Sequence, residues 1–196
     1  MSTITEKPQQ QELQQGSLIL ITGGARSGKS TLAEKIAQDK TSKDGKVIYL
    51  ATATVYDKEM EKRVDLHRQR RPDYWITVEE PIDMEKVIAQ WDQPDHIILI
   101  DCLTLWLTNL ILPHYPEHWS NEHEEAILER AKQVALQAKK SLATIIVVGN
   151  EVGMGIVPVD PLSRIFRDLS GLIQQAFAKE ADQVFLTVSG YPLQVK

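Results

Sequence analysis

The sequence predicts an α/β fold in which a mostly parallel sheet is flanked by helices. Short apolar runs alternate with helical patterns, a glycine-rich loop joins the first run to the first helix, and a later apolar run ends in aspartate. We expect strands at 18–22, 46–51, 75–78, 96–101, 144–149 and 183–188. We expect helices at 29–38, 58–70, 84–90, 103–112, 122–140 and 161–179. A turn at 190–192 followed by 193–195 would add a small edge hairpin at the C-terminus.

The first strand leads into the segment TGGARSGKS, which contains the pattern Gly-x4-Gly-Lys-Ser. Gly23 and Gly28 let the backbone curl with its N–H groups pointing inward, and Lys29 supplies a positive charge for the outer phosphates. Ser30 opens the next helix, where its hydroxyl is available to Mg2+ and the helix N-terminus attracts an anion. Because a strand precedes this loop and a helix follows it, the pattern favours a P-loop NTPase-like domain over an incidental glycine-rich turn.

A second nucleotide signature is the run Ile97–Asp101, four apolar residues that end in a carboxylate. A buried strand of this kind would deliver Asp101 to the carboxyl edge of the sheet, beside Mg2+. Apolar strands often end in aspartate, so the run alone is equally compatible with an ordinary strand end. Together with the glycine loop it favours a metal site.

The composition fits one soluble enzyme domain. The chain has 196 residues, 42% of them hydrophobic, which is enough to fill a core. Residues 1–16 are polar and glutamine-rich and are expected to form a loose tail, and 17–196 a single catalytic domain. The net charge of −5 argues against nucleic acid as the partner. Cys102 is the one cysteine, which favours a reducing cytoplasm, and we expect it to be buried.

No membrane span is expected either. The longest strongly apolar helical stretch is 103–112, about half of the roughly 20 residues that a transmembrane helix needs.

The expected helix at 58–70 contains His67, and the type of reaction depends on the role of this histidine. It would place Met60, Val64 and His67 on one face. One interpretation is a core histidine beside a solvated row of arginines. In the other, neighbouring guanidinium charges keep His67 neutral and nucleophilic and attract a triphosphate. The arginines stand at positions 63, 68, 70 and 71.

Four further residues have two possible roles each. Asn150 and Glu151 follow an expected strand, so they form either a simple strand-ending turn or part of a ligand site. Arg164 and Arg167 lie one helical turn apart and face either that site or solvent.

Three histidines have a spacing that fits no common metal-ligand pattern. They are His114, His118 and His123.

Seven segments, in this order, carry a family resemblance: TGGARSGKS (22–30), YLATA (49–53), DKEMEKRVDLHRQRRP (57–72), WITVEEP (75–81), DCLTLWLTNL (101–110), NEVGMGIVP (150–158) and FRDLSG (166–171). In them the chain resembles the bifunctional adenosylcobinamide kinase/adenosylcobinamide-phosphate guanylyltransferases of cobalamin biosynthesis. The resemblance covers nearly everything from residue 18 to residue 196.

This resemblance implies two reactions in one enzyme. The first phosphorylates the aminopropanol hydroxyl of adenosylcobinamide with ATP or GTP. The second transfers GMP from GTP to that phosphate through a guanylyl-histidine, giving adenosylcobinamide-GDP and pyrophosphate. The resemblance assigns the histidine to His67, which with Lys29 is an expected catalytic residue, and it implies a homotrimer. The implied nucleotide contacts, with Ser30 and Asp101 also binding Mg2+, are Gly23, Gly24, Ala25, Arg26, Ser27, Gly28, Lys29, Ser30, Ala51, Thr52, Ala53, Arg68, Gln69, Arg70, Arg71, Glu79 and Asp101.

Two other functions remain open at this point. A P-loop small-molecule kinase without nucleotidyl transfer would use the glycine loop and Asp101 but leave His67 a packing role. A nucleotide-dependent switch or nucleic-acid motor would hydrolyse nucleotide without an acceptor and respond to a partner. Protein labelling from GTP that carries the label on its α-phosphate distinguishes these functions from guanylyl transfer.

Overall fold

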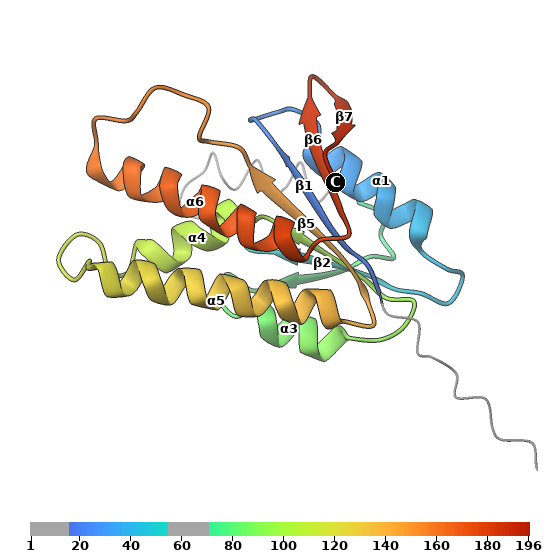
Figure 1. Ribbon diagram of the computed structural model, residues 1–196. Coiled ribbons are helices and arrows are strands. Elements are labelled where there is room, and N and C mark those ends of the chain that lie inside the picture. Colours follow the sequence, from blue (N-terminus) through green and yellow to red (C-terminus); the bar gives the residue numbers. More distant parts are fainter. Residues whose placement is uncertain (1–15, 55–70) are drawn as a thin grey trace, which may run out of the picture.

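The computed structural model describes residues 16–54 and 71–196, whose strands form one seven-stranded sheet (Figure 1). The sheet order is β3-β2-β4-β5-β1-β6-β7, and all neighbouring pairs are parallel except β6 and β7. The mostly parallel α/β fold predicted from the sequence is therefore confirmed. The strands are β1 (Leu18–Gly23), β2 (Val47–Ala51), β3 (Ile76–Glu79), β4 (Ile97–Asp101), β5 (Thr144–Asn150), β6 (Gln183–Val188) and β7 (Tyr191–Gln194).

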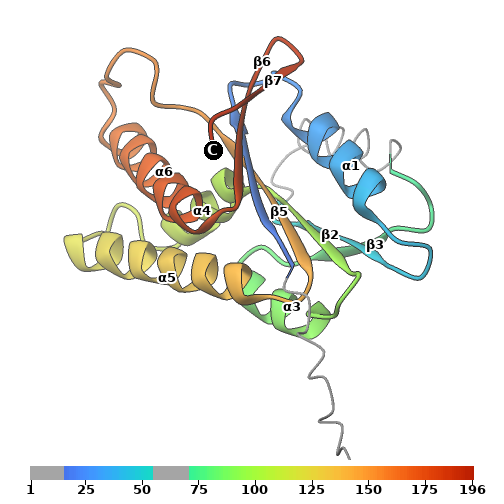
Figure 2. The ribbon, with the colours of Figure 1, turned by 45° about the vertical axis from the view of Figure 1, so that its right-hand side comes forward.

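Helices cover both faces of the sheet, with α1 on one face and α3, α4, α5 and α6 on the other (Figure 2). Their bounds are α1 (Lys29–Lys40), α3 (Met84–Trp91), α4 (Leu103–Ile111), α5 (Asn121–Lys140) and α6 (Pro161–Glu180). This arrangement explains why the central strands are continuously apolar rather than alternating. In β1, Leu18 and Leu20 belong to the core beneath α3–α6, whereas Ile19 and Ile21 belong to the core beneath α1.

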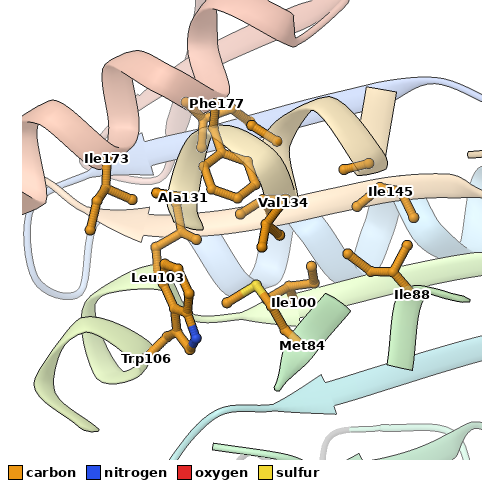
Figure 3. Packing of buried hydrophobic residues seen from close by; sticks show 14 of the residues in the cluster. Met84, Ile88, Ile100, Leu103, Trp106, Ala131, Val134, Ile145, Ile173 and Phe177 are labelled. Carbon is orange, nitrogen blue, oxygen red and sulfur yellow. The ribbon is translucent and has the colours of Figure 1, made fainter. Parts of the chain in front are cut away.

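The larger core joins four helices to the sheet, and Figure 3 shows part of it. Trp106 of α4 and Phe177 of α6 are fully buried there, together with Val134 of α5 and Met84 of α3. The indole nitrogen of Trp106 donates a hydrogen bond to the carbonyl oxygen of Ile82 at 2.8 Å, which satisfies its one polar atom. This core supports the face of the sheet opposite α1.

Most predicted elements are confirmed, with ends that shift by one or two residues. The hairpin differs, because Ser189 and Gly190 form its turn with φ values of 51° and 87°. Positive φ at both central residues suits the twist of a tight hairpin, so Tyr191 and Pro192 belong to β7 rather than to the turn. The predicted helix at 58–70 lies outside the described residues. Within 16–54 and 71–196, none of the helices combines the length and the hydropathy of a membrane span.

Candidate active site

The glycine loop lies between β1 and α1, at the carboxyl end of the central strand. Gly23 has φ +150°, and a Cβ atom there would lie 2.5 Å from the backbone oxygen of Thr187 on β6. Gly28 has φ +102°, and a Cβ atom there would lie 3.1 Å from Cα of Gly190. The N–H of Gly190 donates to the carbonyl oxygen of Ser27 at 2.9 Å. The β6–β7 hairpin therefore packs directly behind the loop, which explains both glycines.

Replacing Gly23 by alanine is expected to lower the free energy of unfolding by about 1–3 kcal/mol, because the backbone would be strained and the new methyl group would contact β6. Gly24→Ala is the matched control, since no heavy atom lies within 4 Å of a Cβ atom there. Urea denaturation of the two variants measures the difference. Equal losses in both would contradict this account of Gly23.

Lys29 is the first residue of α1, and only 6% of its surface is exposed. Its Nζ donates to the carbonyl oxygen of Gly24 at 2.6 Å, so the ammonium group lies across the glycine loop. Burial lowers the pKa of Lys29, and the neighbouring Cys102 and Asp101 act in the opposite direction. A cation at this place can contact the outer phosphates of a nucleotide held by the loop.

The side-chain carboxylate of Asp101 accepts two hydrogen bonds from described residues at the end of β4. Ser30 Oγ donates to Asp101 Oδ2 at 3.0 Å, and the Tyr49 hydroxyl donates to the same oxygen at 2.8 Å. Burial, followed by the nearby Asp101 carboxylate, raises the pKa of Tyr49, so the phenol remains a neutral donor. Hydroxyl and carboxylate oxygens are hard ligands of the kind that Mg2+ prefers, usually shared with phosphates and water. Ser30 and Asp101 thus fit a magnesium site.

Other predicted nucleotide contacts come to the same edge of the sheet. Parallel pairing places Ala51 of β2 beside both Asp101 of β4 and Glu79 of β3. Arg71 is 8% exposed, and its Cζ lies 3.6 Å from the centre of the Tyr49 ring. Gly24, Ala25 and Arg26 form the exposed part of the glycine loop.

Thr52 forms hydrogen bonds in the interior of the fold that the sequence did not reveal. It is fully buried, its hydroxyl donates to the carbonyl oxygen of Cys102 at 2.8 Å, and it accepts from the N–H of Cys102 at 2.7 Å. The side-chain amide of Asn109 donates to the carbonyl oxygens of Thr52 and Pro81, at 2.8 and 3.1 Å. These bonds join β2, β4 and α4 beside Asp101. A buried asparagine in an apolar helix was the available signal, because such a side chain needs partners.

Cys102 is buried, as predicted, and burial raises the pKa of its thiol to about 11. Its Sγ lies 3.0 Å from Thr104 Oγ1. At neutral pH a thiol whose pKa is raised in this way is mostly protonated.

The end of β5 and the residue after it lie beside the glycine loop, whereas Arg164 lies farther along, in α6. Asn150 Nδ2 donates to Thr104 Oγ1 at 3.0 Å, and the N–H of Glu151 donates to the carbonyl oxygen of Gly23 at 2.9 Å, so this turn lies against the glycine loop. Arg164 donates to the carbonyl oxygen of Pro158 at 3.0 Å and supports the loop before α6.

An apolar pocket of about 400 Å³ lies between α4, α6 and the segment that joins β5 to α6. Its lining residues are Thr108, Ile111, Leu112, Val152, Pro158, Leu162, Ser163, Phe166 and Arg167.

Four predicted site residues lie outside the described residues, namely His67, Arg68, Gln69 and Arg70. Within the described ranges, no group of three or more His, Cys, Asp or Glu side chains could hold a metal ion. A metal at Ser30 and Asp101 would consequently need phosphate and water oxygens to complete its ligands.

The chain is similar to known proteins in sequence and in fold. Residues 19–195 match the family model described as cobinamide kinase / cobinamide phosphate guanyltransferase. The bifunctional adenosylcobalamin biosynthesis protein CobU of Escherichia coli K12 is 38% identical over 184 residues, which cover 91% of this chain and 99% of that protein. The bifunctional adenosylcobalamin biosynthesis protein CobP of Pseudomonas aeruginosa is 42% identical over 177 residues, covering 90% of this chain and 96% of that protein.

The structure also resembles a solved structure from Pyrococcus horikoshii OT3. The TM-score is 0.54 at 12% sequence identity, with 93% of this chain and 87% of the other covered. This likeness concerns the fold alone.

Proposed function

Because the chain belongs to the cobinamide kinase / cobinamide phosphate guanyltransferase family, we propose that it phosphorylates adenosylcobinamide and then transfers GMP from GTP to the new phosphate. The chain is accordingly a bifunctional nucleotide-using transferase of cobalamin biosynthesis. The observation that carries the proposal is the contact of Ser30 with Asp101 at 3.0 Å, beside a glycine loop crossed by Lys29. It supports one phosphate-binding site for both reactions.

In the kinase step, the backbone N–H groups of the glycine loop and the Lys29 ammonium would hold the triphosphate of ATP or GTP. The aminopropanol oxygen of adenosylcobinamide forms a bond to the γ-phosphorus, while the bond from that phosphorus to the β,γ-bridging oxygen breaks. ADP or GDP leaves, and the hydroxyl proton passes to solvent. Mg2+, held by Ser30 and Asp101, would neutralise charge on the phosphates. The Lys29 ammonium group would stabilise the same charge.

In the guanylyl step, His67 is the nucleophile. A neutral imidazole nitrogen forms a bond to the α-phosphorus of GTP as the bond to the α,β-bridging oxygen breaks, and pyrophosphate leaves. The phosphate of adenosylcobinamide phosphate then attacks the guanylyl-histidine and releases the imidazole. The arginines at 68, 70 and 71 would stabilise the charge that develops on phosphorus. Lys29 would hold the departing pyrophosphate.

The remaining nucleotide contacts and a homotrimeric assembly are proposed on the family resemblance, and a cytoplasmic location is proposed because Cys102 is the one cysteine of the sequence. The proximity of Ala51, Glu79 and Asp101 at one sheet edge supports the nucleotide contacts in particular. We also propose that residues 17–196 form a single catalytic domain.

The test is to incubate the protein with GTP labelled at the α-phosphate, without a corrinoid, and to measure protein-bound label. We expect an acid-labile, alkali-stable adduct, as a phosphorus–nitrogen bond to imidazole gives. Added adenosylcobinamide phosphate should move the label to the corrinoid. A small-molecule kinase would show phosphorylation of adenosylcobinamide with no labelled protein, and that result would contradict guanylyl transfer through histidine.

A further inference from the structure

Tyr49 contacts two parts of the proposed site, the Asp101 carboxylate and the Arg71 guanidinium group. It occupies β2, where its neighbours in the sequence are aliphatic, and only 3% of its surface is exposed. Its hydroxyl contacts Asp101 and its ring lies against the guanidinium group of Arg71. A phenol in a buried aliphatic strand needs a polar partner for its hydroxyl, and that partner here is the proposed metal carboxylate.

The strand register explains how Tyr49 reaches Asp101. On the parallel strands β2 and β4, Tyr49 pairs with Leu99 and Ala51 pairs with Asp101. Side chains two residues apart on a strand share a face, so Tyr49 and Asp101 both lie on the face that α1 covers. The phenol crosses diagonally to the neighbouring strand, where its hydroxyl lies 2.8 Å from Asp101 Oδ2.

The same carboxylate oxygen also accepts the hydroxyl of Ser30 at 3.0 Å. Among the described residues, the hydrogen bonds to Asp101 that involve side-chain donors both end on Oδ2, so Oδ1 is left to a metal or its water ligands. Ser30 approaches from α1 and Tyr49 from β2. Two donors from different elements fix the carboxylate orientation better than one.

The ring of Tyr49 has a second contact. The Cζ atom of Arg71 lies 3.6 Å from the ring centre, and Arg71 Nη1 donates to Thr77 Oγ1 at 3.1 Å. A largely buried guanidinium group is stabilised by an aromatic face. Arg71 is also four positions after His67 in the HRQRRP segment. Tyr49 thus contacts Arg71, the arginine of this segment that lies within the described residues.

We propose that Tyr49 is a positioning residue for both reactions: its hydroxyl orients Asp101 for the divalent cation, and its ring orients Arg71 for the nucleotide phosphates. This inference rests on the proposed roles of Asp101 and Arg71. It assigns the two effects to different atoms of one side chain, so two substitutions separate them. Tyr49→Phe removes only the hydroxyl, and Tyr49→Leu also removes the ring face.

The experiment measures GTP binding by calorimetry, once with EDTA and once across a Mg2+ titration. For Tyr49→Phe we expect unchanged GTP affinity in EDTA and a rise of about tenfold in the Mg2+ concentration that half-saturates the metal-dependent affinity, as loss of a hydrogen bond to a charged group produces. For Tyr49→Leu we expect the same rise and, in EDTA, GTP affinity lower by about three- to tenfold. Both enzyme activities of Tyr49→Phe should show the shifted Mg2+ requirement.

Two further variants make the outcome unambiguous. Tyr74→Phe removes a hydroxyl from a residue that is 73% exposed, and it should behave like the wild type. Asp101→Asn should shift the Mg2+ requirement at least as far as Tyr49→Phe. A shift in Asp101→Asn without one in Tyr49→Phe would overturn the role of Tyr49 alone. No shift in Asp101→Asn would overturn the proposed metal site, and the Tyr49 inference with it.

Tyr49→Phe keeps the packing of the ring, and Asp101 Oδ2 keeps its hydrogen bond from Ser30. We therefore expect its thermal unfolding midpoint to stay close to that of the wild type. A lower midpoint together with an unchanged Mg2+ requirement would identify Tyr49 as a purely structural residue and contradict the proposal.

Discussion

Lys29→Ala is expected to reduce both phosphoryl transfer and guanylyl transfer by about 10²–10³-fold, the usual loss when one stabilising group is removed from a developing oxyanion. In the structure, its ammonium group lies 2.6 Å from the Gly24 carbonyl oxygen and crosses the glycine loop. The same charge would stabilise the γ-phosphoryl group in the first reaction and the leaving pyrophosphate in the second. Initial rates of both reactions at saturating nucleotide give the measurement.

The matched control is Lys35→Ala, which removes an exposed lysine from the same helix. It should retain both activities and bind nucleotide as the wild type does. If Lys29→Ala lost only one of the two reactions, a single phosphate site shared by both would be contradicted.

His67→Ala is expected to separate the two activities. Guanylyl transfer should fall by about 10⁴-fold or more, as losses of an essential nucleophile do, and the protein should lose its label from α-labelled GTP. Phosphorylation of adenosylcobinamide should stay within about threefold of the wild type, because the γ-phosphoryl group is transferred without a covalent enzyme intermediate. Product analysis of the corrinoid with ATP, and then with GTP, measures both effects on one preparation.

His118→Ala serves as the control, since His118 is exposed in the connection between α4 and α5. Its labelling should match that of the wild type. Retention of the adduct in His67→Ala would exclude His67 as the nucleophile. Equal loss of both reactions would instead indicate that His67 has a structural role or takes part in both steps.

Much of the fold could be predicted because it depends on local patterns. The run at 97–101 is apolar at four successive positions, which only a strand covered on both faces requires, and the structure places β4 there between β2 and β5. The first residue of α6 could also be predicted from the sequence. Asp160 accepts a hydrogen bond from the N–H of Ser163 at 2.8 Å, and Pro161 occupies the first turn.

The hairpin boundary was less predictable for a physical reason. Proline and glycine both occur in turns, and the sequence places Gly190 close to Pro192. The deciding property is positive φ at Ser189, which a non-glycine residue seldom adopts and which composition does not reveal. Proline is tolerated in β7 because this strand lies at the edge of the sheet.

Within the site, the glycine loop and Asp101 were predicted because each belongs to a motif with its own chemistry. Tyr49 and Asn109 were not assigned a role. Their importance depends on partners that lie 52 and 57 residues away in the sequence, at Asp101 and Thr52. No local periodicity reports such a pairing.

By itself, the sequence determined a glycine loop with the P-loop pattern, the parallel sheet that carries it, and the family that implies two reactions. Each of these features depends on residues that are contiguous in the sequence, since backbone curvature, strand burial and motif chemistry are local properties. Only the tertiary structure decided which side chains surround Asp101. Strand order and register set those contacts, bringing β2 and α1 to the same carboxylate, where Tyr49 and Ser30 share one oxygen atom.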